Sequence, residues 1–141
     1  MDFTQLLKVM SERGGSDLFV TAGAAPSIKV DGTIKPLTRE KLNPAQTRAL
    51  VYSTMNDKQL AEFEGTNECN FALSAPGIGR FRVSAFVQRN SPGMVLRSIA
   101  SHIPSMDELK LPPVLRDLSM TKRGLILFVG GTSTGKSTSL A

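Results

Sequence analysis

The amino-acid sequence predicts an α+β fold over residues 1–100, followed by the start of a second, α/β-type domain. Three observations predict it: runs with the periodicity of amphipathic helices, runs that alternate apolar and polar residues, and one continuous apolar run that leads into a glycine-rich loop. Helices mixed with alternating strands are typical of a mainly antiparallel sheet with flanking helices.

The first elements are a helix, a strand and a hairpin. Apolar residues at helical spacing predict the helix: Phe3, Leu6, Leu7 and Met10. Residues 16–23 predict a short strand, and residues 27–37 predict a hairpin. Asp31 and Gly32 form its turn, because aspartate and glycine accept the positive φ angles of a two-residue loop.

Two further helices and a strand follow. Asn43 and Pro44 predict a helix start, since asparagine caps the free backbone N–H groups and proline suits the first helical position. Residues 56–65 predict a short helix that ends at Gly65. Residues 67–75 predict the next strand.

The strand predicted over residues 79–90 has two chemically different faces. Its apolar face consists of Phe81, Val83, Ala85 and Val87. Arg80 and Arg82 lie two positions apart and therefore share the other face. The Ser-Pro-Gly sequence at 91–93 predicts a turn into a partner strand that carries Arg97.

Residues 101–122 predict an interdomain linker with short helices. Ser105 and Glu108 have the spacing of a capping box that opens one helix. The two prolines at 112–113 end it, and residues 114–120 predict another short helix.

The composition excludes several classes of protein. The 141 residues are 40% hydrophobic and 21% charged, without the run of about 18 apolar residues that a membrane span needs, and the N-terminus does not resemble a signal peptide. One cysteine, Cys69, and one histidine, His102, argue against a disulfide framework, a metal site or a thiol catalyst. A reducing cytoplasm fits this usage.

Positive charge is concentrated in the second half of the chain. Residues 79–141 hold nine Lys and Arg and three Asp and Glu, and no acidic residue lies between Cys69 and Met106. That window holds Arg80, Arg82, Arg89 and Arg97. Such a zone suggests contact with a polyanion: nucleotide phosphates, nucleic acid or an acidic partner.

A phosphate-binding motif begins the second domain, predicted over residues 123–141. The apolar run at 125–129 predicts a strand buried in a parallel sheet, and the loop after it matches G-x-x-x-x-G-K-[ST]. The candidate nucleotide-binding residues are Gly130, Gly131, Thr132, Ser133, Thr134, Gly135, Lys136, Ser137 and Thr138. In such loops backbone N–H groups surround the phosphates, the lysine contacts the β- and γ-phosphates, and the Ser hydroxyl binds Mg²⁺. Lys136 and Ser137 are therefore the candidate catalytic residues, with ATP as the default nucleotide.

Four stretches together resemble the PilT/PilU retraction ATPases of type IV pili, within the type II/IV secretion ATPase superfamily. They read SDLFVTAGAAPSIKVDGTIKPL, GRFRVSAFVQRNSPGMVLRSI, IPSMDELKLPPVL and RGLILFVGGTSTGKSTSLA. The resemblance covers essentially the whole chain, and RNSPGMVLRSI with ELKLPPVL favours the PilU branch.

The resemblance implies a PAS-like N-terminal domain joined by a linker to a RecA-like ATPase domain. It also implies a cytoplasmic homo-hexamer that binds ATP between the two domains and drives pilus retraction and twitching motility. The implied partners are the inner-membrane pilus platform and a paralogous retraction ATPase, without direct nucleic-acid contact. Family members use arginines of the N-terminal sheet to reach the nucleotide phosphates, and Arg82 and Arg97 are the matching positions, with Arg80 next.

Two features depart from a complete family site. Ser133 stands where the family loop usually has glycine, which predicts strain of about 1 kcal/mol if that position needs positive φ. The acidic and histidine motifs of the family follow the phosphate loop and do not occur in these residues. We therefore expect the 141-residue chain to be an inactive N-terminal fragment with a poorly packed terminal segment.

The alternatives are another secretion or pilus-assembly ATPase, a non-catalytic ring-forming domain, and a nucleic-acid-binding module. The last is disfavoured because the chain has no Trp and one Tyr, which leaves few side chains for base stacking.

Overall fold

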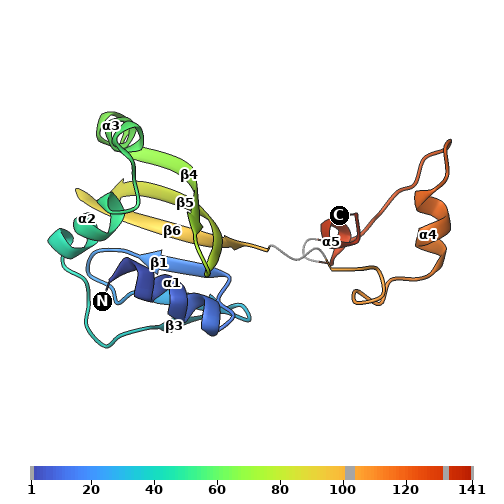
Figure 1. The fold of residues 1–141 in the computed structure, drawn as a ribbon, viewed down its shortest axis with the longest axis horizontal. Coiled ribbons are helices and arrows are strands. Elements are labelled where there is room, and N and C mark those ends of the chain that lie inside the picture. The colour runs from blue at the N-terminus through green and yellow to red at the C-terminus, as the bar shows by residue number, and fades with distance from the viewer. Residues whose placement is uncertain (1, 101–103, 132–133, 141) are drawn as a thin grey trace. The chain divides into compact units, whose positions relative to one another are not determined.

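A computed structural model describes residues 2–100, 104–131 and 134–140, and it divides the chain into two units, Met1–Ser101 and His102–Ala141. The helices and strands of the first unit are α1 (Phe3–Glu12), β1 (Asp17–Val20), β2 (Ser27–Val30), β3 (Thr33–Pro36), α2 (Pro44–Tyr52), α3 (Asp57–Thr66), β4 (Glu68–Ala75), β5 (Gly79–Gln88) and β6 (Ser91–Ile99) (Figure 1). Those described in the second unit are α4 (Val114–Ser119) and α5 (Lys136–Leu140).

A six-stranded sheet organises the first unit, in the order β3-β2-β1-β6-β5-β4. Every pair of neighbouring strands is antiparallel. The sheet therefore brings β1, near the N-terminus, beside β6, some 80 residues later. The prediction of an α+β fold with an antiparallel sheet is confirmed for this unit.

Two tight turns set the register of the sheet. Asp31 and Gly32, with φ angles of 49° and 78°, form the turn predicted between β2 and β3. The turn predicted at Ser-Pro-Gly is wrong: Arg89 and Asn90, with φ angles of 49° and 59°, join β5 to β6, and Ser91 already pairs with Gln88. A two-residue loop with positive φ matches the twist of the strands, so the serine, proline and glycine become part of β6.

The start of α2 agrees with the sequence prediction, whereas the end of α3 does not. The Asn43 side chain accepts a hydrogen bond from the backbone N–H of Gln46 at 2.8 Å, which confirms the predicted start of α2. Gly65 does not end α3, which continues through Thr66. Asn67, with φ of 61°, takes the left-handed position instead, a conformation that asparagine tolerates better than most residues.

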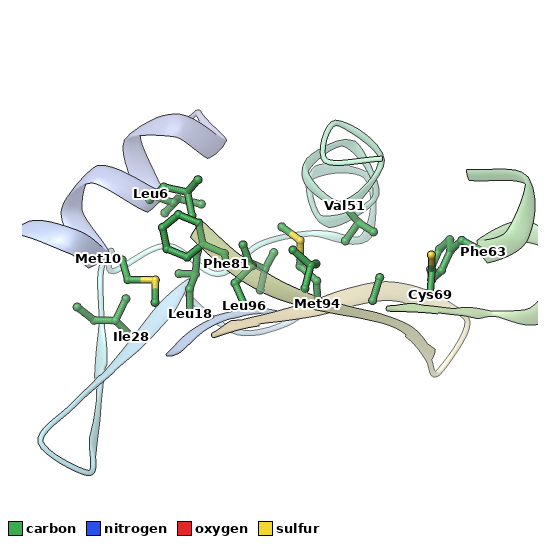
Figure 2. Close-up of a cluster of buried hydrophobic side chains, with 14 residues drawn as sticks. Leu6, Met10, Leu18, Ile28, Val51, Phe63, Cys69, Phe81, Met94 and Leu96 are labelled. Carbon is green, nitrogen blue, oxygen red and sulfur yellow. The ribbon is translucent and has the colours of Figure 1, made fainter. Parts of the chain in front are cut away.

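The helices cover one face of the sheet, and the core lies between them and the strands (Figure 2). The buried apolar residues are Leu6, Leu7, Met10, Leu18, Val20, Ile28, Val51, Phe63, Cys69, Phe81, Val83, Ala85, Met94 and Leu96. Phe81, Val83 and Ala85 belong to the predicted apolar face of β5. Because this face is the inner one, Arg80 and Arg82 lie on the other face of the sheet.

The second unit departs from the predictions in two places. Ser105 and Glu108 form the reciprocal hydrogen bonds of a capping box, but residues 106–110 make turns and no α-helix. The strand predicted over residues 125–129 does not form, and Val129 is 90% exposed. A strand needs a neighbour for its backbone, and none of the described residues pairs with this segment. His102 lies outside the described residues.

Candidate functional site

The face of the sheet opposite the helices of the first unit brings the two predicted arginines together. Arg82 on β5 and Arg97 on β6 are direct register partners. Both side chains are exposed, and they point away from the helices because their neighbours Phe81, Val83 and Leu96 point into the core. The periodicity of β5 predicted the face of Arg82, whereas the register of β6 was needed to place Arg97 beside it.

A carboxylate completes this arrangement. Asp17 on β1 is the register partner of Arg97 on its other side, and its Oδ1 accepts a hydrogen bond from Arg97 Nε at 2.9 Å. The Ser16 hydroxyl donates to Asp17 Oδ2 at 2.8 Å. Asp17, Arg82 and Arg97, with Ser84 and Val95, line a surface hollow of about 210 Å³.

Asp17 is charged despite its burial. It is 5% exposed, and burial alone would raise the pKa of its carboxyl group. The hydrogen bonds from Arg97 and Ser16, with the positive charges of Arg97 and Lys29, outweigh that effect and lower the pKa below its ordinary value. A negative charge therefore lies beside Arg97 on the face of the sheet that carries Arg82 and Arg97 (the arginine face).

The other arginines of the basic window occupy different places. Arg80 shares the face of Arg82 but lies opposite Ile99, two register pairs further along the strands. It lines a separate hollow of about 370 Å³ with Gly79, Phe81 and Ser98 among its other residues. Arg89 lies in the β5–β6 turn. Only Arg82 and Arg97 are directly paired.

The predicted phosphate loop lies in the second unit, before α5. The Lys136 ammonium and the Thr134 hydroxyl both donate to the carbonyl oxygen of Gly131, the latter at 2.8 Å. Lys136 and Thr134 therefore both reach back to the backbone at Gly131. Gly135 has φ of 89°, a conformation that glycine adopts without strain.

Close packing inside the loop also favours glycine at position 130. A Cβ atom at Gly130 would lie 2.8 Å from the Thr134 hydroxyl oxygen, so any side chain there would displace it. Ser137 and Thr138 are exposed in the first turn of α5. Thr132 and Ser133 lie outside the described residues, and the predicted strain at Ser133 stays a prediction.

Asp17 and Ser84 were missed by the sequence analysis. The alternation of β1 places Asp17 with Phe19 on one face and Leu18 with Val20 on the other, which indicates an outward side chain. Its partner Arg97 is 80 positions away in the chain, and no local pattern connects them.

Other kinds of site find little support in the part of the chain that the structure describes. No three His, Cys, Asp or Glu residues of that part are grouped so that they could hold a metal ion. Cys69 is buried, and burial, with the charge of Glu62, raises the pKa of its thiol. None of the described helices is long and apolar enough to cross a membrane.

Comparison with curated proteins finds relatives along the whole chain. It is 60% identical over 141 residues to the type IV pilus ATPase PilU of Pseudomonas aeruginosa and 43% identical over 141 residues to the type IV pilus retraction ATPase PilT of the same organism. A twitching motility protein of Neisseria gonorrhoeae is 32% identical over 136 residues. The chain spans 37%, 41% and 36% of the lengths of these three relatives. No family model matches it.

Comparison with solved structures supports the same relationship. A crystal structure of the pilus retraction motor PilT with bound ADP matches 99% of this chain with a TM-score of 0.83 and 38% identity, and the match covers 41% of that chain. The ATPase DotB of Yersinia pseudotuberculosis, 23% identical, matches 98% of this chain and 39% of its own with a TM-score of 0.71, and shares the fold. The match to PilT includes the mixed helices and the antiparallel sheet. Over its whole length, the chain is therefore similar to the type IV pilus ATPases PilU and PilT, and it is more similar to the PilU than to the PilT of P. aeruginosa.

Proposed function

We propose that this chain is part of an ATP-hydrolysing motor that drives type IV pilus retraction and twitching motility. The observation that carries the proposal is the 60% identity to a type IV pilus ATPase over all 141 residues, which include the phosphate-loop motif. The matched relatives are longer than this chain, so the activity proposed is that of the whole protein.

The proposed organisation has three parts. Residues 1–100 are a PAS-like domain, residues 101–122 are the interdomain linker, and residues 123–141 begin a RecA-like ATPase domain. Six copies form the working ring, which acts in the cytoplasm at the inner-membrane pilus platform, with a paralogous retraction ATPase as a further partner.

The phosphate loop supplies the main nucleotide contacts in this proposal. The backbone of Gly130, Gly131 and Gly135, with the Thr132, Ser133, Thr134 and Thr138 positions, surrounds the phosphates. Lys136 places its ammonium on the β- and γ-phosphates. The contact of this ammonium with the carbonyl oxygen of Gly131, within the same loop, supports the proposal.

The Ser137 hydroxyl is the proposed Mg²⁺ ligand of this chain. It is exposed at the start of α5, and a hydroxyl oxygen suits this hard cation. When bound, Mg²⁺ neutralises charge that develops on the phosphates. Lys136 and Ser137 are therefore the residues of this chain proposed to contribute directly to hydrolysis.

Arg82 and Arg97 supply a second set of phosphate contacts. The two residues are register partners on an exposed face and line one hollow, and two planar donors at one place suit a polyphosphate better than scattered charges do. Closure of the N-terminal domain on ATP would then depend on the γ-phosphate, which couples hydrolysis to domain movement.

Mutation of the phosphate loop in the full-length protein tests the proposal. Lys136→Ala should lower kcat for ATP about a hundredfold, because the transferred phosphoryl group loses its cation. Lys58→Ala removes an exposed lysine of α3 and should leave the rate unchanged. Full activity of Lys136→Ala would contradict the proposal.

A cellular readout separates retraction from the alternative ATPases. Cells that carry Lys136→Ala should keep pili on their surface but lose twitching motility. Loss of the pili themselves would indicate a pilus-assembly or secretion ATPase.

A further inference from the structure

A row of four charged residues runs straight across the arginine face of the sheet. In register order these are Arg82 on β5, Arg97 on β6, Asp17 on β1 and Lys29 on β2. Asp17 is the single acidic member of the row. Because a buried carboxylate is unfavourable unless it is paired, its presence there requires an explanation.

Asp17 uses both carboxylate oxygens in defined contacts. Oδ2 accepts from the Ser16 hydroxyl at 2.8 Å and Oδ1 accepts from Arg97 Nε at 2.9 Å. The Asp17 side chain is 7% exposed, whereas that of Arg97 is 74% exposed. One partner is therefore fixed in the sheet and the other extends from it.

The choice of nitrogen atom decides what Arg97 can still do. A guanidinium carries five N–H groups, and the contact with Asp17 uses only the one on Nε. The two terminal nitrogens, which make the fork that grips phosphate in a bidentate manner, are left for another acceptor. The ion pair thus holds the guanidinium at Nε and leaves its two terminal nitrogens free to bind an anion.

Arg82 lacks such an anchor. Within the described residues, no hydrogen bond or ion pair engages its guanidinium. A long arginine side chain that is not already fixed loses rotamer freedom when it binds, and this loss weakens the binding. Asp17 therefore fixes the Arg97 donor, whereas the Arg82 donor is not fixed.

We propose that Asp17 is a positioning residue, which holds Arg97 through Nε so that its terminal nitrogens face a nucleotide phosphate. The inference rests on the proposed function, in which Arg97 contacts the phosphates. Asp17 itself touches no phosphate, since its carboxylate would repel one. It acts by fixing the donor before the anion arrives.

A double-mutant cycle in the full-length protein tests this role, with kcat/KM for ATP as the measured quantity. Asp17→Ala should lower kcat/KM about tenfold, and Asp17→Asn, which keeps an acceptor oxygen, should lower it by about threefold. In an Arg97→Ala background, Asp17→Ala should change kcat/KM by less than about twofold, because the residue it positions is gone. Thermal unfolding of each variant shows whether the protein still folds.

The outcomes separate the two proposals. Unchanged kcat/KM in the Arg97→Ala variant would contradict the proposed contact between Arg97 and the phosphates. If Arg97→Ala lowers kcat/KM but Asp17→Ala and Asp17→Asn do not, the positioning role of Asp17 is contradicted and the phosphate contact of Arg97 stands. An equal effect of Asp17→Ala with and without Arg97 would mean that Asp17 is merely structural. The partial activity of Asp17→Asn keeps the test informative even if Asp17→Ala folds poorly.

Discussion

Arg82 on β5 and Arg97 on β6 lie directly opposite each other, so two positive charges face one another on the same side of the sheet. Like charges in this position destabilise an antiparallel pair. Asp17 offsets the charge of Arg97 and leaves that of Arg82 uncompensated. Arg82 therefore adds nothing to folding that the structure can identify, which agrees with the proposed phosphate contact.

Replacement of Arg82 by alanine should separate stability from activity. In the 141-residue chain, Arg82→Ala should raise the free energy of unfolding by up to about 0.5 kcal/mol or leave it unchanged, because a repulsion is relieved. In the full-length protein, kcat for ATP should fall about tenfold or more. Chemical unfolding and steady-state ATPase assays measure the two quantities.

Lys35→Ala is the matched control for that experiment, since it removes an exposed positive charge from β3 in the same sheet. Both quantities should stay near those of the parent. A clear loss of stability in Arg82→Ala, with hydrolysis intact, would assign Arg82 to the fold and not to the nucleotide.

The low pKa of Asp17 predicts acid sensitivity. Its carboxyl group has a lower pKa in the folded chain than in the unfolded chain, where the value is about 3.9. The resulting stability is complete above that value and is lost as the pH falls through the lower, folded-state pKa. Between pH 6 and pH 3, the free energy of unfolding should therefore fall more for the parent chain than for the Asp17→Asn variant.

Denaturant titrations at a series of pH values measure this difference. The other carboxylates titrate in both proteins, so the difference between the two curves isolates Asp17. Parallel curves over the whole range would show that the ion pair contributes no pH-dependent stability.

The fold of the first unit could be predicted because its signals are local. The alternation of β5 sorts Phe81 inward and Arg82 outward, and Asn43 caps its own helix three residues away. The β5–β6 turn was misplaced because Arg89 and Asn90 take positive φ angles without glycine. The twist of the paired strands selects that turn, and the Ser-Pro-Gly sequence was the stronger local signal.

The site could be predicted only in part, for the same reason. The phosphate loop is a contiguous motif, so its residues were found together. The arginine face depends on a register between β1, β6 and β5, and Asp17 meets Arg97 across 80 residues of chain. Sequence spacing carries no information about such a contact.

Replacement of Gly65 by alanine tests the corrected end of α3. Gly65 is inside the helix and exposed, and a Cβ atom there would meet no heavy atom within 4 Å. Alanine should therefore stabilise the chain by about 0.5–1 kcal/mol, since glycine has greater conformational freedom in the unfolded state. Destabilisation, measured by chemical unfolding, would instead agree with a helix that ends at Gly65.

The same substitution at Gly93 should have the opposite effect. Gly93 is buried in β6, and a Cβ atom would lie 3.0 Å from Cε2 of Phe86 and 3.2 Å from the carbonyl oxygen of Val20. The neighbouring strand backbone cannot give way without weakening the β1–β6 pairing, so Gly93→Ala should destabilise the chain by about 1–3 kcal/mol. A further change of Phe86 to leucine should recover part of the loss, because it removes one of the two close contacts. No recovery in the double variant would assign the whole cost to the backbone contact with Val20.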